Sequence, residues 1–551
     1  MAGEGSFDEV LIELWERGVT RREAVRRISI GVGALSAAGW LAACGSSDDD
    51  DDDKAAATPK KGGILTVGAE EDAYPLSGDE ANVGQYPLNA NIFEGLVRMD
   101  PDYGIVPVLA TSWSIRQGKT WRFKLREGVK MHDGQPFTAE SVVYSFDRIA
   151  AKGGGTPGFV KGGTKAVGDL TVDITPKFPN LRLLEQIVHP EYSIAATGTD
   201  PVKKPTGTGP FRFGSYQRQK QLVVKRFDDY WGTPALLDEI HFKFLPDANA
   251  RRLALESGEV GLILGVPSDA AQSLEGKGFT VHTSAPGAYE AMYANIGGRK
   301  GYTLLQDDAV RHAIEYAIDR DALVKGVFNG QGNTEQTMVP ARLLGADAKK
   351  IQGYTYDTAK AEQLLEDAGW KAGDGGIRAK GGRKLELQLV SGFPSAAVHT
   401  GVAEFVQDQL KRVGIGVKIV KTPDSAAYTA RTETLQGDLW LERGNQNDAN
   451  PSFLPALLFS EKGLFGPGDY QKMFAPGGKF DKDITAALAA PDEPRVKSLV
   501  ADAMHTLIDT DAIVIPLAGV PQIAASGKTV SGFVPHPSGL QVRYDRVGLT
   551  A

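Results

Sequence analysis

The sequence has a single cysteine, Cys44, among its 551 residues. One cysteine cannot form an internal disulfide, and the lack of a Cys-x-x-Cys pair excludes the common zinc and dithiol motifs. Positive charge is also scarce, since 61 Lys and Arg face 69 Asp and Glu for a formal net charge of −8. Part of the negative charge is one run, Asp48 to Asp53. A nucleic-acid partner is not expected, because phosphate neutralisation needs a clustered excess of Lys and Arg.

Motifs of catalysis are missing as well. No two of the eight histidines stand in the His-x-x-x-His spacing of a zinc-protease helix, and there is no Gly-x-Ser-x-Gly elbow. Gly527-Lys528-Thr529 imitates a phosphate-binding loop, but Gln522 replaces its first glycine; Gly207-Thr208-Gly209 imitates a dinucleotide fingerprint, but Arg212 replaces its third. We therefore predict no catalytic residue, metal ligand or cofactor. An enzyme with carboxylates scattered along the chain is left as an alternative.

The length exceeds the size at which one hydrophobic core keeps growing, so two or three domains are expected. Hydrophobic residues make up 42% and charged residues 24%, which is ordinary for a globular protein.

The first 44 residues are typical of an export signal. Arg21-Arg22 and further basic residues precede an apolar stretch from Ile28 to Ala43, which is shorter than the ~20 residues that span a membrane. Thr20-Arg21-Arg22 resembles the twin-arginine (Tat) signal, and Leu41 to Cys44 resembles a bacterial lipobox, whose cysteine is lipidated. We predict a lipoprotein signal at 1–44 with lipidation at Cys44, and a disordered acidic tether at 45–61.

Apolar periodicity predicts alternating strands and helices, and so an α/β architecture. Strands are expected at Ile64–Val67, Trp121–Leu125 and Thr171–Ile174 and from Val417, where short apolar runs or period-two alternation occur. Helical spacing covers 307–328, with Asp307 or Asp308 as N-cap. It also covers a helix capped by Thr358 and ended by Gly369, and another that ends at Gly414.

Four stretches together resemble family 5 of the bacterial extracellular solute-binding proteins, the peptide and nickel group. They are Asn91–Val97 with Pro107 and Trp113; Phe123–Gly134 running on to Val142; Gly207–Phe211 with Asp229–Gly232, Leu237–Ile240 and Ser257–Val260; and Val310–Ile314 with Ala317–Arg320, Tyr356-Asp357 and Leu364–Trp370. Gly261 and Ser141 depart from the family pattern, which has acidic residues there. In these stretches, Gly128, Gly134, Gly207 and Gly209 are expected in turns with positive φ.

The resemblance implies a bilobal, type II periplasmic-binding clamp with an extra inserted domain, which closes on its ligand by hinge motion. By analogy, lobe I comprises 62–92, 204–297 and 511–551, the inserted subdomain is 93–203, and lobe II is 298–510. The implied function is capture of a small solute outside the cytoplasm for an ABC importer, whose permease and ATPase subunits are the expected partners. We expect a monomer, anchored by its lipid to the outer face of the cytoplasmic membrane (periplasmic or cell-surface). A receptor or chaperone-like binder without a transport partner is a second alternative.

The same resemblance points to ligand contacts at seven residues: Tyr86, Phe159, His189, Trp440, Arg443, Asn445 and Asp448. Peptide binders of the family place a carboxylate in the last loop to pair with the ligand's ammonium. In this chain the matching position is Asn447, and Asp448 is one step away. Nickel relatives carry an arginine at His189 and a tryptophan at Asn445.

The segments from Tyr356 to Leu385 and from Tyr428 to Arg431, in contrast, resemble the nickel branch more than the peptide binders. A peptide ligand is our first hypothesis, and a nickel chelate or other solute is the alternative. Each of these positions also has a structural interpretation: Tyr86 and Trp440 can pack within their lobe, Arg443 can form a surface ion pair, and His189 can cap a turn.

Overall fold

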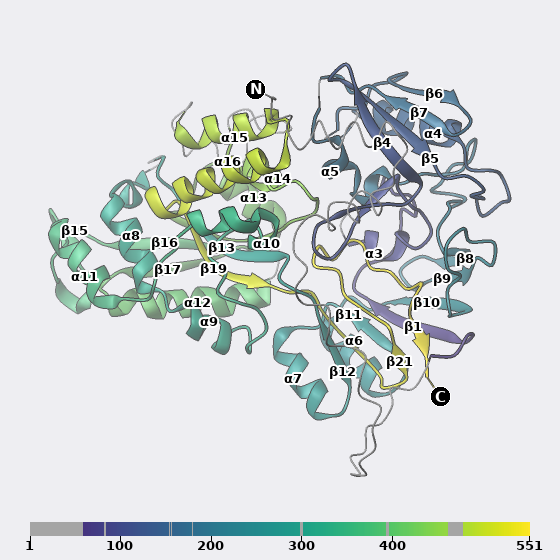
Figure 1. Ribbon diagram of the computed structural model, residues 1–551. Coiled ribbons are helices and arrows are strands. Elements are labelled where there is room, and N and C mark those ends of the chain that lie inside the picture. Colours follow the sequence, from purple (N-terminus) through teal and green to yellow (C-terminus); the bar gives the residue numbers. More distant parts are fainter. Residues whose placement is uncertain are drawn as a thin grey trace, which may run out of the picture. The chain divides into compact units, whose positions relative to one another are not determined.

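The computed structural model describes residues 59–81, 84–153, 155, 157–178, 180–297, 301–392, 396–460 and 478–550 (Figure 1). The predicted signal, Cys44 and nearly all of the predicted tether lie outside these residues. The last part of the tether is described, and there the Lys60 backbone N–H donates to the Leu549 carbonyl at 2.9 Å. Within the described residues, no helix combines the length and apolarity that crossing a membrane requires.

A seven-stranded sheet gathers strands from both ends of the body. Its order is β12-β20-β11-β1-β10-β9-β8, and β1 runs parallel to both of its neighbours. The strands are β1 (Ile64–Ala69), β8 (Phe211–Gln217), β9 (Gln221–Arg226), β10 (Glu239–Phe244), β11 (Leu262–Leu264), β12 (Thr280–Thr283) and β20 (Ile523–Ser526). The opening strand predicted at Ile64 is confirmed.

The two faces of this sheet pack against different elements. Leu65 and Val67 join a core that includes Tyr544 near the C-terminus. The other core takes Ile263 and Ala525 from the sheet and packs them against α6 (Ala248–Glu256) and α7 (Ser268–Gly276). Burial on both faces fits the nearly continuous apolar sequence of β11 and β20, whereas β10 alternates buried and half-buried residues.

A second sheet has five strands in the order β17-β16-β18-β13-β19. These are β13 (Ala288–Ala294), β16 (Glu386–Ser391), β17 (Gly416–Lys421), β18 (Leu439–Asn445) and β19 (Val514–Val520). β16 runs parallel to β17 and β18, and β13 runs antiparallel to both of its neighbours. The strand predicted from Val417 is confirmed.

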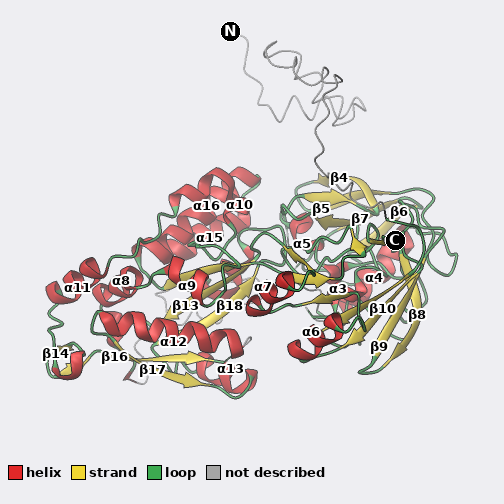
Figure 2. Cartoon of the chain, turned by 90° about the horizontal axis from the view of Figure 1, so that it is seen from below, coloured by secondary structure: helices red, strands yellow, loops and turns green. Residues whose placement is uncertain are grey.

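Helices cover both faces of the five-stranded sheet (Figures 1 and 2). Leu439 and Leu441 of β18 face the core formed with α8 (Asp308–Ala317), α9 (Arg320–Gly326), α11 (Thr358–Asp367) and α12 (Ala396–Arg412). Trp440 points to the opposite core, together with α10 (Ala341–Leu344), α14 (Phe453–Phe459), α15 (Lys479–Ala489) and α16 (Glu493–His505). α13 (Ser425–Glu433) lies between β17 and β18 in the chain.

A four-stranded sheet, β4-β5-β7-β6, lies wholly within the predicted inserted segment 93–203. It consists of β4 (Ala110–Arg116), β5 (Thr120–Leu125), β6 (Thr164–Gly168) and β7 (Thr171–Ile174). The period-two prediction for β5 is confirmed, since Trp121, Phe123 and Leu125 are all buried. α4 (Ala139–Ala151) begins after Thr138, and Ser141 completes its capping box by accepting from the Thr138 backbone N–H at 3.4 Å. Serine at position 141, where the family has an acidic residue, therefore still completes the helix cap.

Short elements complete the fold. They are α3 (Tyr86–Asn89) and α5 (Leu183–Ile187), with the paired strands β2 (Val97–Met99) and β3 (Ile105–Pro107), β14 (Ala379–Lys380) and β15 (Arg383–Lys384), and β21 (Val530–Ser531) and β22 (Gly548–Leu549).

The helical segment predicted over 307–328 is two helices. α8 is capped by Asp307, whose side chain accepts from Ala309 N–H, and the chain turns out of the helix at Ile318. Asp319 then caps α9 by accepting from Ala322 N–H. The cap of α11 is Asp357 and not Thr358, because the Asp357 side chain accepts from Lys360 N–H and Thr358 is the first helical residue.

The expectation of positive φ is right for two glycines and wrong for two. Gly128 and Gly134 have φ of 75° and 87°. Gly207 and Gly209 are not among the positive-φ residues. A Cβ at Gly207 would lie 2.3 Å from the Ile92 carbonyl oxygen, and one at Gly209 would lie 2.4 Å from that of Asn91. Close backbone approach, and not turn geometry, requires glycine at these two positions.

Sheet pairing bears on the predicted lobe boundaries. The predicted lobe I includes residues 288–297 and 511–520. These ranges contain β13 and β19, which pair within the five-stranded sheet. The chain passes from one sheet to the other between Thr283 and Ala288, and again between Val520 and Ile523. These pairings favour crossovers at 284–287 and 521–522. The division into lobes otherwise stays a prediction.

Candidate ligand-binding site

Two of the predicted contact residues pack against each other. Tyr86, the first residue of α3, is 4% exposed, and its hydroxyl donates to the Ala81 carbonyl at 2.9 Å. Its ring meets His189 edge-on with centroids 4.9 Å apart. His189 Nδ1 accepts from the Glu191 backbone N–H at 3.3 Å, so this side chain caps the turn that follows. Burial lowers the pKa of His189 to about 4, which makes the ring neutral at pH 7.

Two other predicted residues are buried aromatics. Phe159 is 3% exposed and stacks on Phe146 with centroids 4.4 Å apart. Trp440 is fully buried in the core on one face of the five-stranded sheet. Both side chains are part of the hydrophobic core. Their roles as ligand contacts stay predictions.

The last predicted residues lie on β18 and the loop after it. Arg443 is opposite Glu290 of β13 in the strand register. Asn445 Nδ2 donates to the Ser538 carbonyl at 2.5 Å. Asp448 is 4% exposed, and its Oδ1 accepts from Asn450 N–H at 2.9 Å and from Gln446 Nε2 at 3.2 Å. Burial raises the pKa of Asp448 well above its usual value, which favours the neutral acid.

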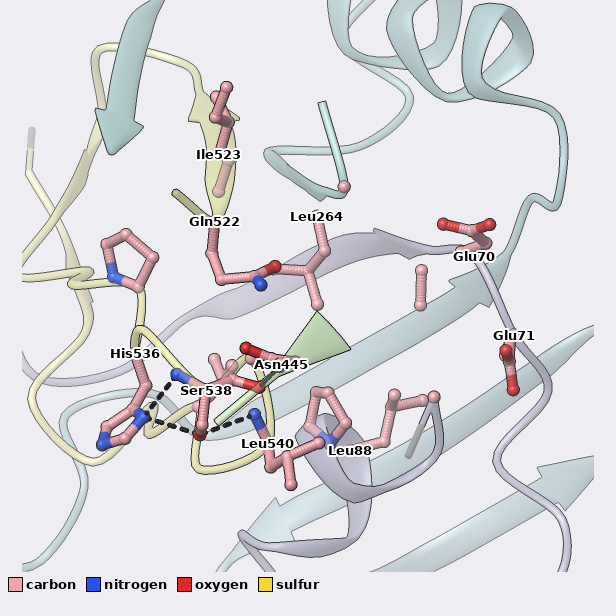
Figure 3. Close-up of a pocket in the computed structure, with 18 of the residues that line it drawn as sticks. Glu70, Glu71, Leu88, Leu264, Asn445, Gln522, Ile523, His536, Ser538 and Leu540 are labelled. Atoms are coloured by element: carbon pink, nitrogen blue, oxygen red, sulfur yellow. Dashed lines mark hydrogen bonds between the residues drawn. The ribbon is translucent and has the colours of Figure 1, made fainter. Parts of the chain in front are cut away.

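Asn445 is the predicted contact residue that lines a cavity of ≈ 270 Å³ in the body (Figure 3). The wall is formed by the end of β1, the start of α3, the end of β11, the last residue of β18 and the segment from Gln522 to Val542. Parallel strands end at this wall, because β1 and β11 both point their carboxyl ends toward it. Ligands of open α/β sheets bind at such ends.

Negative charge is concentrated on one side of the cavity. Figure 3 shows Glu70 and Glu71 there, at the end of β1, and His536 and Ser538 on the opposite side. Glu70 pairs with Arg251 at 3.4 Å. Burial and the neighbouring Glu70 raise the pKa of Glu71. None of the described lining residues is Lys or Arg, so the cavity has an acidic character.

Neutral polar groups form the opposite side. His536 Nδ1 accepts from the Ser538 backbone N–H at 3.2 Å and lies 2.8 Å from Ser538 Oγ. Burial lowers the pKa of His536 to about 4, so its ring is neutral at pH 7. Asn445 Oδ1 is buried without a hydrogen-bond partner among the described residues. Together with the Gln522 side chain, it gives the cavity amide groups that can bind a polar solute.

The sequence analysis missed Glu70, Glu71, Gln522, His536 and Ser538. A usable signal existed for the two glutamates, since they follow the predicted opening strand directly, where ligands of open sheets bind. No local signal marks Gln522, His536 or Ser538, because contacts distant in the sequence bring them to the cavity. Among the described residues, no group of three or more His, Cys, Asp or Glu side chains is arranged to hold a metal ion.

A separate buried carboxylate, Glu94, is occupied by protein donors. It accepts from Tyr230 Oη at 2.8 Å, Trp231 Nε1 at 2.8 Å and Thr208 Oγ1 at 3.0 Å, and it faces Arg543 at 3.5 Å. The adjoining cavity is only ≈ 40 Å³ and includes His189 in its wall. This site holds together parts of the chain that are distant in the sequence and leaves little room for a solute.

The two helix-covered sheets with the inserted four-stranded sheet, and the cavity at the strand ends, define a bilobal solute-binding clamp of type II with mixed α/β structure. The chain belongs to the bacterial extracellular solute-binding proteins, family 5, whose model matches residues 104–465. Members of this family bind solutes, and the chain is a binding protein and not an enzyme.

Curated relatives and solved structures match over most of the chain. The nickel-binding periplasmic protein of Escherichia coli is 26% identical over 503 residues, which cover 86% of this chain and 93% of that protein. The dipeptide-binding protein of the same organism is 29% identical over 472 residues, covering 79% of this chain and 84% of that protein. A crystal structure of NikA from Brucella suis in complex with Fe(III)-EDTA superimposes with a TM-score of 0.78 at 26% identity, covering 89% of this chain and all of that one.

Proposed function

We propose that this protein is an exported lipoprotein that captures a small solute, foremost a peptide, and delivers it to an ABC importer. Family membership supports the binding role, and the dipeptide-binding relative supports the peptide. The observation that carries the peptide hypothesis is the acidic cavity, whose described wall has two carboxylates and no Lys or Arg. Such a wall favours a ligand that carries a positive charge, as the N-terminus of a peptide does.

A nickel chelate is the second candidate, and two comparisons favour it. One relative is named for nickel binding, and the NikA structure holds a metal chelate. In this chain, His536 is the one histidine among the described residues of the cavity wall. An anionic chelate would also meet the carboxylates of Glu70 and Glu71. These features make the peptide the better candidate.

The ligand class is tested with the purified body, residues 45–551. Native mass spectrometry identifies what co-purifies, and melting is then measured with peptide pools and with nickel–histidine. A ligand at 100 times its dissociation constant stabilises the folded protein by about 2.7 kcal/mol. A shift with peptides alone supports the proposal. A shift with nickel–histidine alone replaces the peptide with the chelate.

Delivery and anchoring need separate measurements. Loaded protein should stimulate the ATPase of a reconstituted importer more than empty protein does, because a ligand that binds the closed form better shifts the population toward it. The substitution Cys44→Ala should move the protein from the membrane fraction to the soluble fraction if Cys44 carries the lipid. An unchanged membrane fraction would remove the lipid from the proposal and leave the solute-binding role intact.

A further inference from the structure

The two carboxylates at the end of β1 differ in their partners. Glu70 is paired with Arg251, whose side chain is 3% exposed and also donates to the carbonyls of Leu245 at 2.7 Å and Gly265 at 3.1 Å. The charge of Glu70 is therefore balanced by a cation that is part of the fold. For Glu71, no ion pair with a Lys, Arg or His occurs among the described residues.

The position of Glu71 depends on a glycine across the cavity wall. A Cβ at Gly84 would lie 2.1 Å from Glu71 Cδ and within 2.4 Å of both carboxylate oxygens. The carboxylate thus occupies the space that a side chain at position 84 would fill. Both residues belong to the cavity wall, so the chain brings a carboxylate to the cavity and leaves space for it.

The loop acid that the family resemblance suggested for pairing with an ammonium is engaged elsewhere. Both bonds to Asp448 Oδ1 come from its own loop, from Asn450 N–H and Gln446 Nε2. Gln446 itself is fully buried, and its Nε2 also donates to the carbonyls of Asp448 and Asn450, each at 2.9 Å. Asp448 therefore supports the shape of this loop, and it is not part of the described cavity wall.

We propose that Glu71, and not Asp448, is the residue that pairs with the positively charged amino group of the solute. This inference rests on the proposed function and narrows it to solutes with a free, protonated amine. The rest of such a solute extends toward the side with Asn445 and Gln522, where Asn445 Oδ1 offers a buried acceptor (Figure 3). Glu70 takes part indirectly, because Arg251 already neutralises it.

Two peptide mixtures and three variants test this inference. One mixture contains di- to pentapeptides with free N-termini, and the other is the same mixture after N-acetylation. Native mass spectrometry shows which peptides the wild-type protein retains, and calorimetry on the best-retained peptide gives its affinity. A charge-assisted pair predicts that N-acetylation or Glu71→Gln weakens binding by about tenfold to hundredfold. Asp448→Asn, which keeps the Oδ1 acceptor, should bind the peptide with wild-type affinity. Glu70→Gln should lose less affinity than Glu71→Gln does.

Equal retention of both mixtures would overturn the inference and leave peptide binding in place. So would an unchanged affinity of Glu71→Gln with a large loss in Asp448→Asn. Retention of neither mixture would end both the peptide hypothesis and this inference. Gly84→Ala is a fourth variant, which keeps the charge of Glu71 but displaces its carboxylate, and it should also weaken binding. Melting curves that match the wild type show that a lost affinity is not a folding defect.

Discussion

The buried acids Glu94 and Glu315 of the scaffold and Glu71 of the cavity wall differ in the partners that the protein supplies. Glu94 accepts three side-chain hydrogen bonds and faces Arg543, and Glu315 in α8 is fully buried and paired with Arg320. Glu71 at the cavity wall pairs with no cation among the described residues. The two scaffold carboxylates are buried and take their donors from the protein, as buried polar groups must. Glu71 is exposed at the cavity wall, and its carboxylate is therefore accessible to a ligand.

This difference explains why a sequence motif can mark a family without marking its site. Glu94 lies in the stretch Asn91 to Val97 that carries the resemblance. Its contacts with Thr208 and Trp231 join that stretch to two segments of the third stretch, Gly207–Phe211 and Asp229–Gly232. The motif therefore reports how the body is assembled. On our proposal, ligand specificity depends on Glu71, which the resemblance does not include.

The largest expected effect breaks a scaffold pair. Arg320 donates through Nη2 to Glu315, through Nη1 to the Glu315 carbonyl at 3.1 Å, and through Nε to the Pro516 carbonyl at 2.7 Å. Arg320→Leu should lower the free energy of unfolding by about 3–5 kcal/mol, because Glu315 is left buried without its cation. Burial already raises the pKa of Glu315 to about 7 despite the neighbouring Arg320. Urea unfolding measures the loss.

The matched control for this substitution is Arg252→Leu. Arg252 pairs with Glu256 at 2.7 Å, but the Arg252 side chain is 27% exposed. A partly exposed pair on one helix should cost only about 0.3–0.5 kcal/mol. Equal losses in the two variants would contradict the distinction between buried and solvated pairs.

A smaller loss is expected at Glu94. Glu94→Gln removes the charge and replaces one acceptor oxygen with an amide that donates, beside Tyr230, Trp231 and Arg543. The free energy of unfolding should fall by about 1.5–3 kcal/mol, since hydrogen bonds to a charged group are lost. The same change at Glu71 should leave stability unchanged. If Glu71→Gln destabilised the protein as much as Glu94→Gln does, the cavity acid would belong to the scaffold.

The pH dependence of binding sharpens the comparison on the cavity side. Burial and Glu70 raise the pKa of Glu71 above its ordinary value of 4.5. The ligand's amine stays charged as the pH falls from 7, but Glu71 takes up a proton as the pH passes through its raised pKa. Affinity is therefore full above that pKa and is lost below it, by up to about tenfold per pH unit for one proton. Calorimetry at stepped pH should show this fall in the wild type and a flat profile in Glu71→Gln.

The smallest expected loss of stability is at Asp319, whose carboxylate caps a helix. Asp319 caps α9 by accepting from Ala322 N–H at 2.9 Å. Asp319→Ala should cost about 1 kcal/mol, and Asp319→Asn, which also caps well, should cost much less. Thermal unfolding of the two variants distinguishes them. A cost for Asn as large as for Ala would mean that the charge, and not the cap, stabilises this helix.

Much of the fold could be predicted from the sequence, because burial on a strand or helix leaves a local period. Trp121, Phe123 and Leu125 show this for β5. Helix ends were harder to predict where two adjacent residues could each act as the N-cap. Asp357 and Thr358 can both cap a helix, and the apolar spacing over 307–328 does not reveal that Asp319 starts a new one.

The candidate site could be predicted only in part. Asn445, the last residue of β18, belongs to a segment that the resemblance marked, and the structure includes it in the cavity wall. For Gly207 and Gly209 the prediction of positive φ was wrong. Glycine is required there by close approach to the carbonyls of Ile92 and Asn91, which are distant in the sequence. Glu71 and Gln522 meet the same cavity from opposite ends of the chain. No window of sequence contains that information.

The two crossovers between the sheets are bonded to each other. Ser284 N–H donates to the Gln522 carbonyl at 3.0 Å, and Gln522 N–H donates to Ser284 Oγ at 2.9 Å. The hinge motion that the family fold implies would be taken up by backbone torsions in these two short links, and their mutual hydrogen bonds would couple the torsions of one link to those of the other. The Gln522 side chain also lines the cavity, so a solute bound there would contact one of the two links directly.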